Sequence, residues 1–130
     1  KVPHSVQGRD YSALFINGKA AVKRPDAALY IQNMDGTKNA EGIVSDYFPS
    51  ARGIKTGRYT LAFYINRKHK RVKTLFFDDW NDPYQLHNIT PTDRPIDYEK
   101  LCLRLGELLH EIDDPWYKQG ILNEILKYKK

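Results

Sequence analysis

The sequence predicts an α+β fold: an antiparallel sheet of about four strands, covered on one face by a long C-terminal helix, with a further short terminal helix. Two observations lead to this expectation. The middle of the chain holds closely spaced aromatic and β-branched segments separated by short turns, which is typical of a β-meander. The last third carries apolar residues at spacings of three and four, which is typical of an amphipathic helix.

The composition fits one folded domain. The chain has 130 residues, a formal charge of +5 and an apolar content of 41%, which suits one modest core and excludes a disordered chain. Its apolar runs are too short to span a bilayer, and no signal-peptide pattern opens it. Because the first residue is Lys1 rather than Met, we expect a processed or excised piece. The positive charge favours anionic partners: nucleic acid, sulfated glycans or acidic lipids.

Residues 1–27 are predicted to form a linker with one short helix, and residues 28–130 the folded subdomain. Ala28–Gln32 is apolar and predicts a strand, whereas Met34–Glu41 contains Asp-Gly and predicts a loop. The short helix is indicated by apolar residues at helical spacing before Asn17-Gly18: Tyr11, Leu14, Phe15 and Ile16.

Three more strands are expected over Arg52–Thr56, Tyr59–Ile65 and Val72–Phe77. Gly57-Arg58 is a natural tight turn between the first two, because glycine tolerates a positive φ. Since all the connections are short, the strands should pair as an antiparallel meander.

The chain after the sheet predicts three helical segments. Asp82 is a good N-cap and Pro83 a good first residue for a single helical turn ending at His87. Asp114-Pro115 repeats this start before a short helix that Gly120 weakens. Between them lies the long helix, whose apolar face comprises Tyr98, Leu101, Leu105, Leu108, Leu109 and Ile112.

No catalytic or metal-binding constellation emerges from the residues. Glu107 and His110 have i, i+3 spacing, but one such pair on an exposed helix face favours a solvated ion pair. Asp78-Asp79 and Asp113-Asp114 point apart in regular structure, and Cys102 favours a semi-buried helix position over a nucleophile. None of the histidines pairs with another His or a Cys at metal-ligand spacing: His4, His69, His87 and His110.

The basic segment Arg67–Arg71 is the best binding candidate by charge alone. It could steer a sulfated or phosphorylated polymer, although a solvated turn that keeps a sheet edge soluble is the favoured interpretation.

Several sequence segments, which we call phrases, resemble the C-terminal subdomain of the sulfatase family, in the alkaline-phosphatase-like superfamily. They occur in the family's order along nearly the whole chain. They are Val6–Asp10 with Leu14-Phe15 and Gly18; Arg52–Tyr59; Leu75–Ile89; and the helix Tyr98–Ile112 with its ending Asp113-Asp114-Pro115-Trp116. The first lacks the usual proline, and Gln85 stands where Glu is usual. Asp78, Asp82, Pro83 and Asn88 are in place, and we assign structural roles to Asp82, Pro83 and Asn88.

The resemblance implies a parent enzyme that hydrolyses sulfate esters of glycans in a bacterium, in the periplasm or outside the cell. Sulfatases use a formylglycine, made in a C/S-x-P-x-R motif, and a calcium ion. That motif is absent here, so formylglycine and calcium would belong to the large catalytic domain, and this chain alone should be inactive. Its expected partners are that domain and a sulfated carbohydrate, rather than nucleic acid or a membrane.

Two residues are expected to contact the substrate. The resemblance implies Arg52, because the family tends to supply recognition residues from Ser45 to Arg52, and His4 is a further polar candidate. The fork of an arginine suits a sulfate or uronate. For Arg52 the alternative is an ion pair with a local carboxylate.

Two other functions stay open. One is a stand-alone anion-binding module for sulfated polysaccharide or nucleic acid, and the other is a related phosphoesterase. A piece of a sulfatase should expose an apolar face that the catalytic domain covers, whereas a stand-alone module should be polar outside its site.

Overall fold

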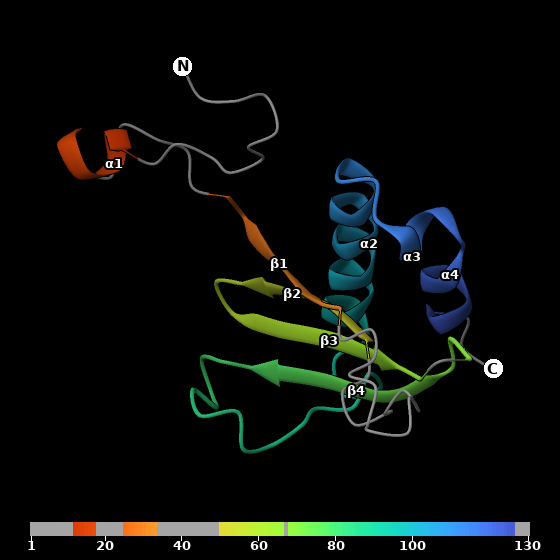
Figure 1. Cartoon of the computed structure of the whole chain (residues 1–130). Helices are drawn as coiled ribbons and strands as arrows, with labels where there is room; N and C mark the ends of the chain where they lie inside the picture. The colour runs from red at the N-terminus through yellow and green to blue at the C-terminus, as the bar shows by residue number, and fades with distance from the viewer. Residues whose placement is uncertain (1–11, 18–24, 34–49, 67, 127–130) are drawn as a thin grey trace, which may run out of the picture.

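The computed structural model describes residues 12–17, 25–33, 50–66 and 68–126. The elements from residue 25 onward form two layers, with helices packed on one face of a sheet (Figure 1). The predicted α+β fold is confirmed. The elements are α1 (Ser12–Asn17), β1 (Ala27–Gln32), β2 (Ser50–Thr56), β3 (Tyr59–Ile65), β4 (Arg71–Asp78), α2 (Pro95–Glu111), α3 (Pro115–Lys118) and α4 (Ile121–Leu126).

The sheet is a meander in which every strand pairs antiparallel with its neighbour in sequence, in the order β1-β2-β3-β4. Its strands begin and end within one or two residues of the predicted bounds. Ile54 pairs with Leu61, and Leu61 pairs with Phe76. Because directly paired residues point to the same face, these three side chains form an apolar row under α2.

The core lies between this row and α2. Phe76 and Tyr98 have ring centroids 5.7 Å apart, and Phe63 meets Tyr98 edge-on at 6.2 Å. Leu105 and Leu109 of α2 are fully buried against the sheet. Each such leucine contributes roughly 1.5–3 kcal/mol through the apolar surface it removes from water.

Helix α2 follows the predicted apolar face with two corrections. Ile112 lies at the C-cap, after the last turn, and is 42% exposed, because the chain leaves the helix there. Cys102, expected to be semi-buried and off the strongest face, is buried with the core residues. Pro95 occupies the first turn, where the absence of an N–H costs nothing.

The C-terminal segment forms two short helices instead of the expected one. Gly120 has φ +69°, a left-handed conformation that ends α3 before α4 begins at Ile121. The predicted cap is confirmed, since Oδ1 of Asp114 accepts a hydrogen bond from the Trp116 amide at 2.8 Å.

The helical turn predicted from Pro83 to His87 is wrong. Gln85 has φ +55°, which a right-handed helix cannot contain. Asp82 still organises the segment: its carbonyl accepts from the Gln85 amide at 3.0 Å, and its carboxylate accepts from the His87 amide at 2.7 Å. The aspartate therefore closes a non-helical turn.

The turn at Gly57-Arg58 is present, but the reason expected for it is wrong. Gly57 does not adopt a positive φ. Instead, Oγ1 of Thr56 accepts from the Tyr59 amide at 2.9 Å and from the Arg58 amide at 3.3 Å. The threonine side chain therefore holds this connection.

The predicted N-terminal helix is present as α1, in which Phe15 and Ile16 are exposed. The rest of the predicted linker and the loop Met34–Glu41 lie outside the described residues, and the division at residue 27 stays a prediction. In the basic segment, Arg67 also lies outside them. The side chain of Asn66 accepts from the amides of Lys68 and Lys70 at 2.9 and 3.1 Å, which makes a compact solvated turn.

Candidate functional site

Arg52 lies inside the fold, between the sheet and the C-terminal helices. Its Nε donates to Oδ2 of Asp114 at 2.8 Å, and its Nη1 donates to the carbonyl of Ala51 at 2.9 Å. The guanidinium also lies 5.1 Å from the ring centroid of Trp116. Arg52 and Asp114 are only 2% and 4% exposed. This buried pair therefore joins β2 to the start of α3, and each charge compensates the other in a poorly solvated place.

Of the two predicted substrate contacts, the structure describes one, Arg52. The arrangement of Arg52 is the alternative named above, an ion pair with a carboxylate. His4 lies outside the described residues. A contact between either side chain and a substrate stays a prediction.

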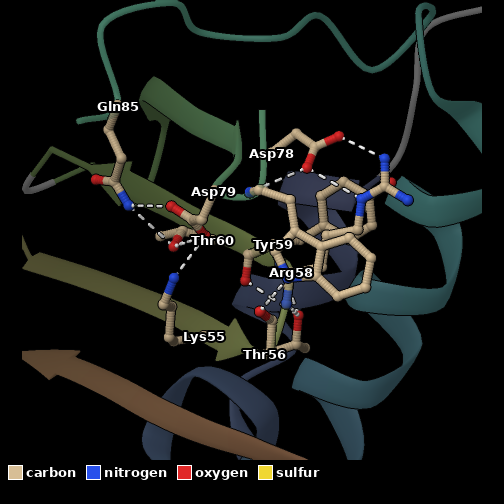
Figure 2. Close-up of polar contacts among 10 residues, drawn as sticks. Lys55, Thr56, Arg58, Tyr59, Thr60, Asp78, Asp79 and Gln85 are labelled. Atoms are coloured by element: carbon tan, nitrogen blue, oxygen red, sulfur yellow. Dashed lines mark hydrogen bonds and ion pairs between the residues drawn. The ribbon is translucent and has the colours of Figure 1, made fainter. Parts of the chain in front are cut away.

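A second set of polar side chains surrounds the β2–β3 turn and the end of β4. We call it the turn cluster; it comprises Lys55, Arg58, Thr60, Asp78, Asp79 and Gln85 (Figure 2). The register explains its place, since Tyr59 pairs with Asp78 and Thr60 with Phe77. The turn and the end of β4 are therefore adjacent.

Asp78 is a buried carboxylate with several donors. Nε and Nη2 of Arg58 donate to its two oxygens at 3.0 and 2.6 Å, and the side chain of Asn81 donates at 2.9 Å. Chiefly because of the hydrogen bonds from Arg58, the pKa of Asp78 is lowered to about 2. It is therefore ionised at neutral pH and cannot act as a general acid.

The negative charge of Asp79 is compensated by a different set of donors. Nζ of Lys55 and Oγ1 of Thr60 donate to its Oδ2 at 2.5 and 2.8 Å, and Nε2 of Gln85 donates to its Oδ1 at 2.6 Å. Burial favours the neutral acid, but these hydrogen bonds outweigh it and lower the pKa of Asp79. Both adjacent carboxylates are thus ionised and paired.

Arg58 connects the cluster to aromatic rings. Its guanidinium lies 4.9 Å from the ring centroid of Tyr59 and 5.2 Å from that of Trp80. The indole N–H of Trp80 donates to the carbonyl of Gly57 at 2.9 Å. Trp80 is therefore oriented by two contacts while 71% of it remains exposed.

The described residues offer stabilising contacts rather than reactive groups. Burial raises the pKa of Cys102 to about 12, so at neutral pH it is a thiol and a poor nucleophile. Within the described ranges, no three His, Cys, Asp or Glu residues group as metal ligands. No described helix has the length and apolarity to cross a membrane.

No family model matches the chain. An endo-4-O-sulfatase from Bacteroides thetaiotaomicron is 52% identical over 128 residues, which are 98% of this chain and 25% of that protein. The resemblance to the sulfatases is confirmed. The chain spans about a quarter of the length of this curated relative.

Solved structures agree with this match. A structure from work on glycosaminoglycan metabolism by Bacteroides thetaiotaomicron is 52% identical, with a TM-score of 0.79 over 97% of this chain and 26% of that one. The putative sulfatase yidJ from Bacteroides fragilis shares the fold at 24% identity, with a TM-score of 0.64 over 89% of this chain and 22% of its own. A third structure, solved with its substrate D-glucosamine-2-N,6-O-disulfate, shares the fold at a TM-score of 0.67 and 23% identity, over 88% of this chain and 22% of that one.

Three residues of the sulfatase-like phrase make structural contacts, although Asp82 does not cap the helix that was expected of it. Asp78 binds Arg58, Asp82 closes its turn, and Oδ1 of Asn88 accepts from the Phe76 amide at 2.7 Å. The sequence reasoning missed the partnership of Arg58 with Trp80 and the identity of the carboxylate that binds Arg52. A strand register would have indicated that Arg58 lies beside Asp78, since Tyr59 pairs with Asp78.

Proposed function

We propose that the chain is the C-terminal subdomain of a bacterial sulfatase, and that the whole enzyme hydrolyses sulfate esters of glycans. The observation that carries this proposal is the 52% identity over 128 residues with an endo-4-O-sulfatase, of which the chain spans only 25%. The chemistry would then lie in the large domain, which on this proposal carries the formylglycine and the calcium ion. The subdomain would have a structural and substrate-recognition role.

The described side chains support this division of labour. The carboxylates of the turn cluster are ionised and paired, and the thiol of Cys102 is buried and protonated at neutral pH. An ionised carboxylate cannot protonate a leaving alcohol, the oxygens of these two carboxylates are occupied by hydrogen-bond donors, and a protonated thiol is a poor nucleophile. We therefore propose that the chain alone does not hydrolyse sulfate esters.

The proposal includes a location and partners. The enzyme would act in the periplasm or outside the cell, where sulfated glycans are met. Its partners would be its own large domain and a sulfated carbohydrate, with no role for nucleic acid. Residues 1–27 would connect the large domain to the subdomain 28–130. His4 and Arg52 would lie near the sugar.

The experiment compares this chain with the longer polypeptide that its gene encodes. Both are incubated with 4-O-sulfated glycosaminoglycan oligosaccharides, and released sulfate is measured. We expect release by the longer protein and none by the chain, and we expect Ala in place of the C/S of C/S-x-P-x-R to abolish it. A complete reading frame without that motif, or sulfate release by the pure chain, contradicts the proposal.

The two recognition residues can be tested in the same enzyme. His4→Ala should raise KM with little change in kcat, because a substrate contact outside the reacting centre contributes uniform binding. An unchanged KM contradicts the role of His4. For Arg52, KM is measured well below the unfolding temperature of the variant, since loss of the buried pair also lowers stability.

A further inference from the structure

The loop that leaves β4 exposes three large apolar side chains within seven residues. Trp80, Tyr84 and Leu86 are 71%, 83% and 73% exposed. Single exposed apolar residues are ordinary on a soluble protein, but several on one short loop indicate a surface that something covers. We call these three residues the apolar loop surface.

The backbone beneath this surface is held in place at both ends. At the start, Oδ1 of Asp78 accepts from the Trp80 amide at 3.3 Å. At the end, the Ile89 amide donates to the carbonyl of Phe76 at 2.7 Å, and the Phe76 amide donates to Oδ1 of Asn88. A loop fixed in this way loses little conformational entropy when it binds a partner.

Trp80 is also fixed in its orientation. Its indole N–H binds the carbonyl of Gly57, and the guanidinium of Arg58 lies over its ring while held by Asp78. Tryptophan is among the residues that contribute most to protein–protein affinity, above all when it is preorganised. These contacts therefore hold the Trp80 side chain on the surface of the protein, outside the core.

The charges beside the loop disfavour an anionic ligand. The two nearby cations, Arg58 and Lys55, are each paired with a carboxylate, Asp78 and Asp79. A sulfate or phosphate would have to compete with these ion pairs for its donors. Leu86, moreover, offers no group to a sugar hydroxyl. These side chains therefore suit contact with an apolar protein surface better than contact with a sulfated glycan.

We propose that the apolar loop surface docks against the large domain of the same polypeptide. This rests on the proposed function, and it names the face of the subdomain that the large domain covers. The supporting observation is length: the chain spans 25% of the sulfatase that it matches, so about three quarters of such a protein would lie outside it. The exposed apolar surface is also the feature that separates a piece of an enzyme from a stand-alone module.

Hydroxyl-radical footprinting of the chain and of the longer polypeptide tests the contact residue by residue. We expect oxidation of Trp80 and Tyr84 to slow about fivefold or more in the longer protein, because docking removes their exposed surface from solvent. Tyr117, which is 45% exposed on α3, should react equally in both proteins. Buried Trp116 should be protected in both and reports that the chain alone is folded.

A matched pair of leucine variants gives a second measurement. Leu86→Ala in the longer protein should raise the rate at which a protease separates the subdomain by about tenfold, the effect of one well-placed interface residue. Leu103→Ala is the control, because Leu103 is 65% exposed on α2, outside the loop, and that variant should leave the rate unchanged. Neither variant should change the stability of the chain alone by more than about 0.5 kcal/mol.

The results separate this inference from the proposed function. If the longer protein releases sulfate while Trp80 and Tyr84 stay fully reactive, the docking inference is overturned and the proposed function stands. Protection that appears in the chain alone at high concentration, or only when a sulfated oligosaccharide is added, assigns the surface to a second copy or to a glycan and also overturns it. A longer polypeptide with no sulfatase activity overturns the proposed function first.

Discussion

Arg52 on β2 and Asp114 before α3 are 62 residues apart in the sequence, yet Nε of the arginine lies 2.8 Å from Oδ2 of the aspartate. The same aspartate caps α3 through the Trp116 amide, so one carboxylate serves both the sheet and the helix. Because both charges are almost fully buried, the loss of either leaves the other without compensation.

Asp114→Asn should therefore destabilise the chain by about 3–5 kcal/mol, the cost of leaving the charge of Arg52 buried and unpaired. Urea unfolding followed by circular dichroism measures the change. Asp113→Asn is the matched control: its side chain is 80% exposed, and asparagine tolerates its φ of +59°, so its effect should stay within about 0.5 kcal/mol. Equal effects of the two substitutions would show that the buried pair does not stabilise the fold.

The Arg58–Asp78 pair should make stability depend on acid. The pKa of Asp78 is about 2 in the folded chain, below the ordinary value of 3.8. At pH values between these two, the unfolded chain therefore binds more protons than the folded chain. The stabilisation is complete above the ordinary pKa and is lost as pH falls through the folded pKa. It amounts to roughly 2 kcal/mol.

Asp78→Asn should flatten this part of the dependence of unfolding free energy on pH between about 5 and 2. Chemical denaturation at a series of pH values measures it. Asp113→Asn should keep the slope of the unaltered chain. A slope that survives Asp78→Asn unchanged would assign the acid sensitivity to other carboxylates.

Two glycines on either side of Thr56 should respond in opposite ways to alanine. A Cβ on Gly53 would lie 2.6 Å from the carbonyl oxygen of Leu61 and 2.8 Å from Cβ of Ala62, so Gly53→Ala should cost about 1–3 kcal/mol. A Cβ on Gly57 meets nothing within 4 Å, and its φ is not positive. Gly57→Ala should thus be neutral or stabilise by up to about 1 kcal/mol. The unfolding temperatures of the two variants and of the unaltered chain measure these effects. A Gly53→Ala protein as stable as the unaltered chain would contradict the close approach of β2 and β3 at this position.

The thiol of Cys102 should react slowly. Burial and a pKa of about 12 leave little thiolate at neutral pH and keep reagents away. With Ellman's reagent at pH 7.5 we expect reaction about a hundredfold slower than in the urea-unfolded chain, limited by opening of the helix from the sheet. Fast labelling of the folded chain would show that α2 does not cover this residue.

The sheet and the long helix were predictable because each follows a local period. Tyr59–Ile65 has the aromatic and β-branched composition of a strand, and its observed bounds match the predicted ones. The errors arose where one residue adopts an unusual backbone angle. Gln85 at φ +55° and Gly120 at φ +69° break helices that composition and capping both allowed.

The polar partnerships were harder to predict from sequence. Nothing in the local pattern around Arg52 shows that Asp114 lies beside it, because their contact depends on how the C-terminal helices pack against β2. The pairing of Arg58 with Asp78 depends on strand register, which a hydrophobic pattern constrains only to a face. The exposure of Trp80 could not be anticipated, since tryptophan in a sheet-to-helix connection is equally compatible with the core.

The linear strand order has a consequence for synthesis on the ribosome. All four strands are complete by Asp78, whereas α2 begins only at Pro95. A ribosome therefore releases a finished apolar face, with Leu61, Phe63 and Phe76, before the helix that shields it has been made. During that interval the nascent sheet depends on the rest of the polypeptide, or on a chaperone, to keep it from associating with other chains.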